Sequence, residues 1–248
     1  MNHLLLEVCV DSVESALAAK EGGADRIELC SNLVVGGTTP STALFKAIKH
    51  YGDIPVHVLI RPRFGDFCYS DYEFEIIQEE IRMFRELGAE GVVIGCLNPQ
   101  GALHMEQMKR LMEEAKEMSV TLHRAFDVCL NPLETLNQAI GLGIHTILSS
   151  GQKNTCMEGK DLLKEMVLLS KGQIEIMPGG GVTAEVLKEL ATYTKAPAYH
   201  MSGKVVLDSP MMYRKEGVTM GVANLSEYEI WQTSKAKIQQ ARQVLDRM

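Results

Sequence analysis

Carboxylates and histidines that could exchange protons with a substrate occur inside short, otherwise apolar segments of the sequence. The segment TLHRAFDV carries His123 and Asp127, and Glu7, Glu28 and His200 occupy comparable segments elsewhere in the chain. Burying a charged side chain without a partner is costly, so catalysis is one reason to place it there. Carboxylates and imidazoles act as general acids and bases, and a carboxylate can fix the tautomer of a histidine. We therefore predict catalytic roles for these five residues.

Two cysteines form a second candidate site. Cys9 and Cys30 are each the third residue of an acid-x-Cys run, EVC and ELC, in neighbouring predicted strands. Adjacent parallel strands lie about 4.8 Å apart, so the two thiols face each other if the cysteines lie at the same height along the two strands. Two soft thiolates are the donors that Cu(I) selects. Buried cysteines are also common as small core residues, so a Cu(I) site and simple core packing both remain open.

Arginines and a glycine-rich loop form a third candidate site, for an anion. Arg61 and Arg63 flank a proline, and two guanidinium groups can clamp a carboxylate or phosphate; the alternative is that they neutralise Glu28 and Asp66. The segment MPGGGVTAE places three glycines before a predicted helix whose first N–H groups are free to bind an anion. The predicted anion-binding residues are Arg61, Arg63, Gly179, Gly180, Gly181 and Ser202.

Eight short apolar segments alternate with eight helical patterns, and these elements must position the candidate residues. The predicted strands cover residues 4–10, 26–30, 56–62, 91–97, 120–127, 146–151, 174–179 and 198–203. The predicted helices cover 12–21, 41–50, 72–87, 104–118, 132–141, 160–170, 184–194 and about 226–247. This alternation predicts an α/β fold, a single-domain (β/α)8 TIM barrel over residues 1–248. An open doubly wound sheet is the alternative, but eight units without a second domain favour the closed barrel.

The alternation of side chains along the strands predicts a polar barrel interior. Successive side chains of a strand point to opposite faces, and the outer face of a barrel packs against helices and must be apolar. Leu6 and Val8 therefore face outward, and Glu7 and Cys9 inward. The charges gather toward the carboxyl ends of the strands, where barrel enzymes place their sites. An ion-paired core without chemistry is the alternative, although apolar residues often stabilise a core as well as buried ion pairs do.

Composition and charge limit the kinds of partner. The net charge is −7 and no run of Lys or Arg occurs, which argues against nucleic acid and anionic membranes. No segment approaches the roughly 20 apolar residues of a membrane span, and the first ten residues do not resemble a signal peptide. We therefore expect a cytoplasmic protein whose six cysteines are reduced thiols.

A long connection near the end of the chain is a candidate for a lid or an interface. Residues 204–225 contain no predicted element, and loops of this length in compact domains are usually functional or mobile. The predicted C-terminal helix around Trp231 is amphipathic. We expect a homo-oligomer, with this helix as a candidate contact.

Six ordered motifs give the sequence a resemblance to a known family. The motifs are LLEVCVDSVESALAA with GGADRIELCSNL and GGTTPS, then IRPRFGDFCYSDYE, TLHRAFDV, ILSSG, MPGGGVT and HMSG. Together they resemble the CutC family, named for copper homeostasis, over about residues 4–226. The resemblance implies a cytosolic (β/α)8 barrel associated with copper handling. It also attributes Cu(I) to the cysteines of the first two strands, here Cys9 and Cys30.

The resemblance also covers other candidate residues. The family's strand-5 histidine and aspartate correspond to His123 and Asp127, and its paired arginines to Arg61 and Arg63. The sequence departs from the family pattern at Ser149, where threonine is common, and at Ala198, where an acidic residue is common.

Two functions from different classes follow from these observations. The first is a cytosolic copper homeostasis protein that binds copper as Cu(I) through Cys9 and Cys30. The second is a TIM-barrel enzyme, a lyase, isomerase or hydrolase. Its substrate would be a small anionic compound, including phosphorylated ones, bound at the C-terminal barrel mouth by Arg61, Arg63 and the 179–181 loop. The expected partners are therefore a copper ion or a small anion, without nucleic acid or membrane.

Overall fold

Eight parallel strands form the centre of the structure, a computed structural model that describes residues 3–220, 222 and 225–248. The strands are β1 (Leu5–Val10), β2 (Arg26–Leu29), β3 (Val56–Leu59), β4 (Gly91–Ile94), β5 (Ser119–Leu122), β6 (Thr146–Ser149), β7 (Glu175–Pro178) and β8 (Ala198–Met201). Their hydrogen-bonded order is β7-β6-β5-β4-β3-β2-β1-β8, so the first strand pairs with the last strand of the barrel. This nearly closed barrel confirms the predicted α/β TIM-barrel fold.

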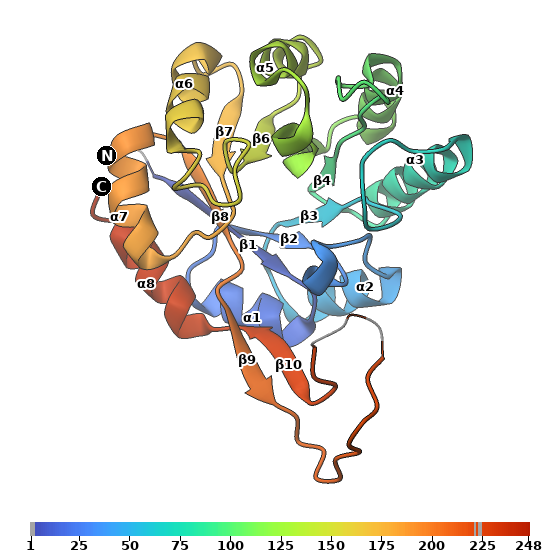
Figure 1. The fold of residues 1–248 in the computed structure, drawn as a ribbon, viewed down its shortest axis with the longest axis vertical. Helices are drawn as coiled ribbons and strands as arrows, with labels where there is room; N and C mark the ends of the chain where they lie inside the picture. The colour runs from blue at the N-terminus through green and yellow to red at the C-terminus, as the bar shows by residue number, and fades with distance from the viewer. Residues whose placement is uncertain (1–2, 221, 223–224) are drawn as a thin grey trace.

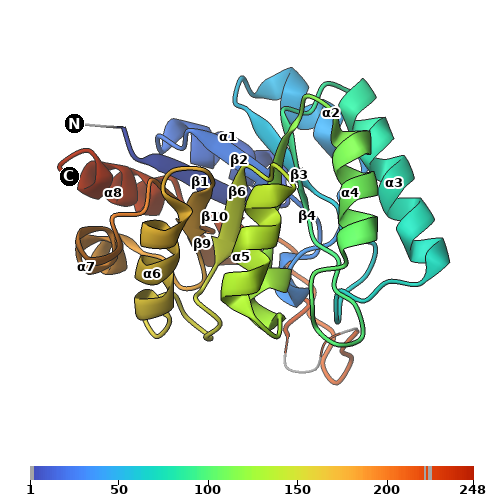
Figure 2. The ribbon, with the colours of Figure 1, turned by 90° about the horizontal axis from the view of Figure 1, so that it is seen from above.

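Helices cover the outside of the barrel (Figures 1 and 2), and the start of β1 lies beside the last helix, where Arg242 donates a hydrogen bond to the carbonyl oxygen of Leu4. The helices are α1 (Val13–Glu21), α2 (Thr42–Tyr51), α3 (Asp71–Glu86), α4 (Met105–Ala115), α5 (Pro132–Gly141), α6 (Lys160–Ser170), α7 (Ala184–Thr194) and α8 (Lys235–Leu245). Two short 3-10 helices, η1 (Leu33–Val35) and η2 (Arg124–Val128), lie in loops after β2 and β5.

Side-chain caps explain where several helices begin. Ser12 and Thr183 are N-caps, and their side chains accept hydrogen bonds from backbone N–H groups in the first turns of α1 and α7. Ser70 and Glu73 form a reciprocal capping box at the start of α3. These caps fix where each loop of the barrel mouth ends.

The two faces of each barrel strand differ as the sequence pattern predicts. Leu6, Val8 and Val10 belong to the large apolar cluster that packs against the helices. Cys30 and Leu59 belong to a separate small cluster within the barrel. Polar side chains occupy the same interior, so the barrel holds an unusually polar core.

Two glycines, one at the start of β4 and one directly after its end, make room for histidines in this interior. A Cβ atom at Gly91 would lie 2.7 Å from the His57 ring, and one at Gly95 would lie 2.7 Å from the His123 ring. Such distances are far too short, so a side chain at either glycine would displace the neighbouring imidazole. The glycines therefore allow two buried imidazole rings to fit against the barrel wall.

The C-terminal region differs from the prediction. Residues 204–208 and 229–233 form the antiparallel strands β9 (Lys204–Asp208) and β10 (Glu229–Thr233), and the last helix begins only at Lys235. The segment EIWQT was wrongly assigned to the helix, because its β-branched and aromatic residues favour a strand when a partner strand is available. The β9–β10 hairpin extends away from the barrel in Figure 1. Within residues 3–220, 222 and 225–248, no helix has the length and apolar character needed to span a bilayer.

Candidate functional site

A cavity of about 660 Å³ opens at the carboxyl ends of the barrel strands. Cys9, Glu28, His123 and His200 contribute to its lining from strands β1, β2 and β8 and from the residue after β5. This volume is in the range of small-molecule sites, and the position is where barrel enzymes bind their substrates.

Glu7 is the most deeply buried acid of this region. Its carboxylate is fully buried and forms an ion pair with Arg26 Nε on β2. His200 Nδ1 on β8 donates a 2.8 Å hydrogen bond to the other carboxylate oxygen of Glu7. Burial alone would raise the pKa of Glu7, but the charge of Arg26 and the hydrogen bond from His200 lower it to about 2. Glu7 is therefore a permanent anion that orients His200.

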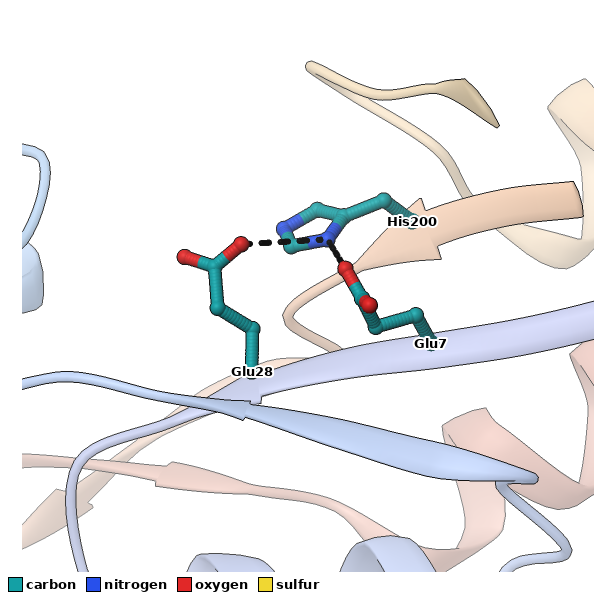
Figure 3. A group of neighbouring side chains, drawn as sticks. All are labelled: Glu7, Glu28 and His200. Carbon is teal, nitrogen blue, oxygen red and sulfur yellow. Dashed lines mark hydrogen bonds and ion pairs between the residues drawn. The ribbon is translucent and has the colours of Figure 1, made fainter. Parts of the chain in front are cut away.

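Glu28 is the second acid, and it differs from Glu7 in its partners. Its Oε2 atom lies 3.8 Å from His200 Nδ1 and has no hydrogen-bond partner among the described residues. Burial raises the pKa of Glu28 to about 7, more than the charge of His200 lowers it. Figure 3 shows Glu7 and Glu28 pointing toward the same edge of the His200 ring. Two neighbouring carboxylates with separated pKa values are typical of an acid–base site.

His200 is held in its charged form by its buried neighbours. Burial lowers the pKa of His200, but the neighbouring Cys9 and Glu7 outweigh this effect and raise the pKa well above its ordinary value. Glu7, Glu28 and His200 also offer ligand atoms within 4.8 Å of one another, which is close enough to hold a metal ion. Because Arg26 and His200 already balance Glu7, the cluster does not need a cation for neutrality.

Two further buried histidines are neutral. Burial lowers the pKa of His57 to about 4 and that of His123 to about 3. His123 borders the cavity, and its Nδ1 accepts a 3.1 Å hydrogen bond from the N–H of Ala125. Its ring packs against Phe67 with 4.7 Å between ring centroids. Of the two, only His123 lines the cavity, so it is the neutral imidazole available to a ligand.

Asp127 does not lie on a strand, contrary to the predicted strand over 120–127. Strand β5 ends at Leu122, and Asp127 belongs to η2. Its carboxylate accepts hydrogen bonds from Ser149 Oγ at 2.6 Å and from the N–H and hydroxyl of Ser150, and it pairs with Arg124. Asp127 therefore connects the loop after β5 to the loop after β6, and its predicted catalytic role gains no support from this position.

The two predicted anion-binding arginines are engaged within the protein. Arg63 pairs with Glu73 and with Asp66, one of the two acids suggested by the sequence, and it does not line the cavity. Arg61 does line the cavity, but its terminal nitrogens donate to the carbonyl oxygens of Gly37 at 3.0 Å and Gly65 at 2.7 Å. Arg61 thus connects two loops, and of its nitrogens only Nε has no partner among the residues described.

The glycine-rich loop lies at the rim of the cavity. Gly180 and Gly181 adopt positive φ angles of 88° and 80°, which glycine tolerates best, and both line the cavity. Ser202 also lines it, whereas Gly179 does not, and a Cβ atom at Gly179 would lie 2.6 Å from Leu148. The first turn of α7 reaches the same rim.

Three basic residues of the rim were missed by the sequence analysis. Arg124, Lys204 and Lys237 line the cavity from η2, β9 and α8. Lys204 follows the HMSG motif directly, which was an available signal. The position of Lys237 depends on how α8 packs beside the barrel, and no local pattern reveals it. Lys204 and Lys237 give the rim positive charge of the kind that the sequence attributed to Arg61 and Arg63, whereas Arg124 is paired with Asp127.

The two candidate copper ligands are not level with each other. Cys9 pairs in register with Glu28, so Cys30, which directly follows β2, lies two residues beyond the partner of Cys9. The Cys9 thiol donates to the carbonyl oxygen of Met201 at 3.7 Å, and that of Cys30 to the carbonyl oxygen of Val10 at 3.5 Å. Burial raises the pKa of Cys30 well above its ordinary value. Cys9 lines the cavity and Cys30 does not, so the pair does not fit a preformed dithiolate site.

Comparison with known proteins identifies similar sequences over most of the chain. A family model described as the CutC family matches residues 4–205. A human protein named copper homeostasis protein cutC homolog is 43% identical over 238 residues, which cover 96% of this chain and 87% of that protein. A family protein CutC from Bacteroides fragilis (strain YCH46) is 45% identical over 231 residues, which cover 92% of each chain.

Solved structures agree with the fold. A structure described as a copper homeostasis protein CutC from Streptococcus agalactiae has a TM-score of 0.77 and 33% identity, over 80% of this chain and 98% of that chain. N-(5'-phosphoribosyl)anthranilate isomerase from Pyrococcus furiosus has a TM-score of 0.57 at 14% identity, over 99% and 100% of the two chains. The second likeness shows only the barrel fold.

Proposed function

Because the chain belongs to the CutC family, whose members include proteins named for copper homeostasis, we propose two functions and rank them by the geometry of the cavity. The geometry best supports an enzyme that performs acid–base chemistry on a small anionic substrate at the carboxyl ends of the strands. The observation that carries this proposal is Glu28, a buried carboxyl with an unpartnered oxygen and a pKa near 7 in a cavity of about 660 Å³.

In this proposal Glu28 exchanges a proton with the substrate. A carboxyl with a pKa close to the working pH is well suited to do so, because both protonation states are populated. Glu7 stays ionised and accepts the hydrogen bond from His200 Nδ1. His200 in turn lies 3.8 Å from Glu28, where its positive charge stabilises the ionised form of Glu28 after proton transfer to the substrate. Arg26 and Glu7 are positioning residues.

The rim supports an anion as the non-reacting part of the substrate. Gly180 and Gly181 allow close approach of a ligand to the backbone, and the positive end of the α7 helix dipole lies at the same rim. Lys204 and Lys237 add positive side-chain charge on the same cavity. A phosphate or carboxylate at this rim would leave the rest of a small molecule in the cavity that Glu28 lines.

Thermal-shift measurements with inorganic phosphate and a library of small phosphorylated and carboxylated compounds test this proposal. Any ligand that binds only the folded state raises the apparent stability. We expect stabilisation by phosphate that weakens in Lys204→Gln and not in Arg82→Gln, because Arg82 lies on α3 outside this cavity. Equal stabilisation of both variants, or none of the wild type by any compound, would contradict the anion site.

A compound found in that screen then tests the acid–base role. Turnover in Glu28→Gln is expected to fall by about a hundredfold or more, since general acid–base catalysis contributes typically 10²–10⁴-fold. Glu80→Gln is the matched control, because Glu80 is also a partly buried acid with a raised pKa but lies outside the cavity, where it accepts a hydrogen bond from Thr39. Undiminished turnover in Glu28→Gln would refute the role.

Cu(I) binding through Cys9 and Cys30 is the second candidate function. The names of the relatives and the position of Cys9 at the cavity support it. The surroundings of Cys30 oppose it, because both sulfurs would have to leave their carbonyl partners and Cys30 would have to ionise where burial disfavours the thiolate. Copper is the bound cargo in this proposal.

Anaerobic titration with Cu(I) and a competing chelator tests the copper proposal. One tightly bound Cu(I) per chain that is lost in both Cys9→Ser and Cys30→Ser, but not in the control Cys156→Ser, would establish the pair as the site. Cys156 is also buried and carries a thiol with a raised pKa, so it reports on nonspecific thiol binding. Unchanged binding in the Cys9→Ser, Cys30→Ser double variant would discard the proposal.

We further propose a cytosolic location and a homo-oligomeric assembly. All six cysteines are free thiols, which fits a reducing compartment. Val206, Leu207 and Ile230 are exposed on the β9–β10 hairpin, and apolar side chains gathered on a protruding hairpin favour a contact with another chain. Light scattering after size-exclusion chromatography tests the assembly, and a monomer at micromolar concentration would contradict it.

A further inference from the structure

Two buried N–H donors at the cavity have no acceptor within the described part of the chain. They are Nε of Arg61 and Nε2 of His123, and the side chains that carry them are more than nine-tenths buried. Both residues line the cavity. Buried polar groups are nearly always paired, so two unpaired donors at one cavity call for a specific explanation.

The hydrogen bond at Nδ1 determines which nitrogen of His123 carries the proton. Nδ1 accepts from the backbone N–H of Ala125 and therefore has no proton of its own. In the neutral ring the proton is then on Nε2, which becomes a donor. Burial lowers the pKa of His123 to about 3, so the ring stays neutral at physiological pH. Nε2 of His123 is thus a fixed, uncharged hydrogen-bond donor.

Close packing holds both donors in place. The His123 ring lies against Phe67, and it lies so close to Gly95 that no Cβ would fit there. The Arg61 guanidinium carbon lies 5.0 Å from the centroid of the same Phe67 ring. The terminal nitrogens of Arg61 are anchored to backbone carbonyl groups, so the side chain cannot swing away. The two donors are therefore organised before any ligand binds.

We infer that Nε2–H of His123 and Nε–H of Arg61 form a two-donor site for a substrate oxygen that gains negative charge, and that the substrate is a small carbonyl compound with a hydrogen on the adjacent carbon. Preorganised N–H donors in a buried site stabilise such developing charge strongly. A neutral imidazole donor combined with a carboxylate base is a known arrangement for proton abstraction next to a carbonyl group. This inference rests on the proposed acid–base function and specifies its substrate class.

The proposed step is a proton transfer without any change of oxidation state. The Glu28 carboxylate takes the proton from the carbon next to the carbonyl, and the electron pair of that C–H bond forms a C=C bond. The carbonyl π electrons move to the oxygen, which accepts hydrogen bonds from His123 and Arg61. Return of the proton from Glu28 to the same carbon restores the C–H and C=O bonds, and exchange of the Glu28 proton with solvent before this return replaces the hydrogen of that carbon.

Two substitutions of His123 separate its roles. Asparagine places its side-chain oxygen near the position of Nδ1, so His123→Asn keeps the bond from Ala125 and removes the donor. Glutamine reaches the position of Nε2 and can return an N–H donor, so His123→Gln should rescue binding in part. His104→Asn is the matched control, because His104 also accepts a backbone N–H through Nδ1, at the start of α4, and does not line the cavity.

Oxalate and phosphoglycolohydroxamate, planar anions that resemble an enolate and an enediolate, are the binding probes. Calorimetry should show one bound molecule of at least one probe per chain. The affinity should fall about tenfold or more in His123→Asn, in line with the loss of a charge-assisted hydrogen bond, and should partly recover in His123→Gln. Nitrogen-15 NMR of labelled histidine should show His123 as the neutral Nε2–H tautomer, and bound probe should shift its N–H signal.

A second measurement follows deuterium exchange from D2O into the carbon-bound hydrogens of a panel of carboxylated and phosphorylated aldehydes and ketones. Exchange into at least one compound, lost in Glu28→Gln and in His123→Asn, supports the inference. Equal probe binding by wild type and His123→Asn, or the absence of exchange in every compound, overturns it. If inorganic phosphate still binds in that case, the anion-binding enzyme of the proposed function stands and only the carbonyl substrate class fails. If neither phosphate nor any library compound binds, both proposals fail.

Discussion

His200 and Glu7, which are 193 positions apart in the sequence, meet through a 2.8 Å hydrogen bond where the last strand of the barrel pairs with the first. The contact forms only when the barrel closes between β8 and β1. The strand pairing that closes this edge of the fold therefore also assembles the acid–base cluster.

Removing the charge of Glu7 should destabilise the fold. Glu7→Gln leaves Arg26 and His200 as buried cations without their shared anion, so we expect a loss of about 3–5 kcal/mol in the free energy of unfolding. Urea denaturation measures this loss. The control Glu21→Gln breaks an exposed pair with Lys235 and should leave the stability nearly unchanged. A Glu7→Gln variant as stable as the control would show that the buried ion pairs do not hold the barrel together.

The position of Glu7 and Glu28 could be predicted from sequence, and the reason is local. Side chains of β1, β2 and β8 alternate regularly between the two faces up to the carboxyl ends of these strands. This alternation alone places their polar side chains inside the barrel. The same rule failed for Asp127, because β5 ends at Leu122 and the chain then forms a 3-10 helix. Side chains in a helix do not alternate between two faces.

Two features could not be predicted because they depend on contacts between segments that are distant in the sequence: the partners of Arg61 and the strand near the end of the chain. Sequence predicted a guanidinium at the cavity, but not that backbone carbonyl groups of two loops hold its terminal nitrogens. Those carbonyls carry no side-chain signature. Strand β10 was not predicted for a similar reason. It forms a strand because it pairs with β9, whose residues lie about 25 positions earlier in the sequence.

A methyl group at either histidine-facing glycine should destabilise the barrel. Gly91→Ala and Gly95→Ala place a Cβ atom 2.7 Å from the rings of His57 and His123, and overpacking of this kind costs about 1–3 kcal/mol. Thermal denaturation with calorimetry measures the effect. Gly141→Ala is the control, since nothing lies within 4 Å of a Cβ there, and it should be neutral or slightly stabilising. Histidine-facing variants as stable as Gly141→Ala would contradict the close packing of the imidazoles.

Asp127 should contribute to stability rather than to proton transfer. Asp127→Ala leaves the hydroxyl of Ser149 and the N–H of Ser150 without their acceptor, so the free energy of unfolding should fall by about 3 kcal/mol. Deuterium exchange into a carbonyl substrate should persist in the folded fraction of this variant. A variant of normal stability that had lost the exchange activity would instead assign Asp127 a direct catalytic role.

The two carboxylates should give opposite dependences of stability on pH. Burial raises the pKa of Glu28 from 4.5 to about 7, so between these values the folded state binds more protons and its stability falls as the pH rises. The pKa of Glu7 is lowered to about 2, so its contribution is complete above pH 4.5 and is lost as the pH falls toward 2. Unfolding free energies from pH 4.5 to 7 should therefore decline less steeply in Glu28→Gln than in the wild type. Parallel curves for the two proteins would contradict the raised pKa.

Carbon-13 NMR of the side-chain carboxyl groups tests whether Glu28 titrates as an acid–base residue should. Glutamate labelled at Cδ is titrated from pH 4 to 9 in the wild type and in Glu28→Gln, and the resonance missing from the variant belongs to Glu28. The account predicts that this resonance titrates near pH 7, while that of Glu7 stays ionised throughout. A Glu28 resonance that titrates near 4.5, as an exposed glutamate does, would contradict the proposal that this cavity carries an acid–base site.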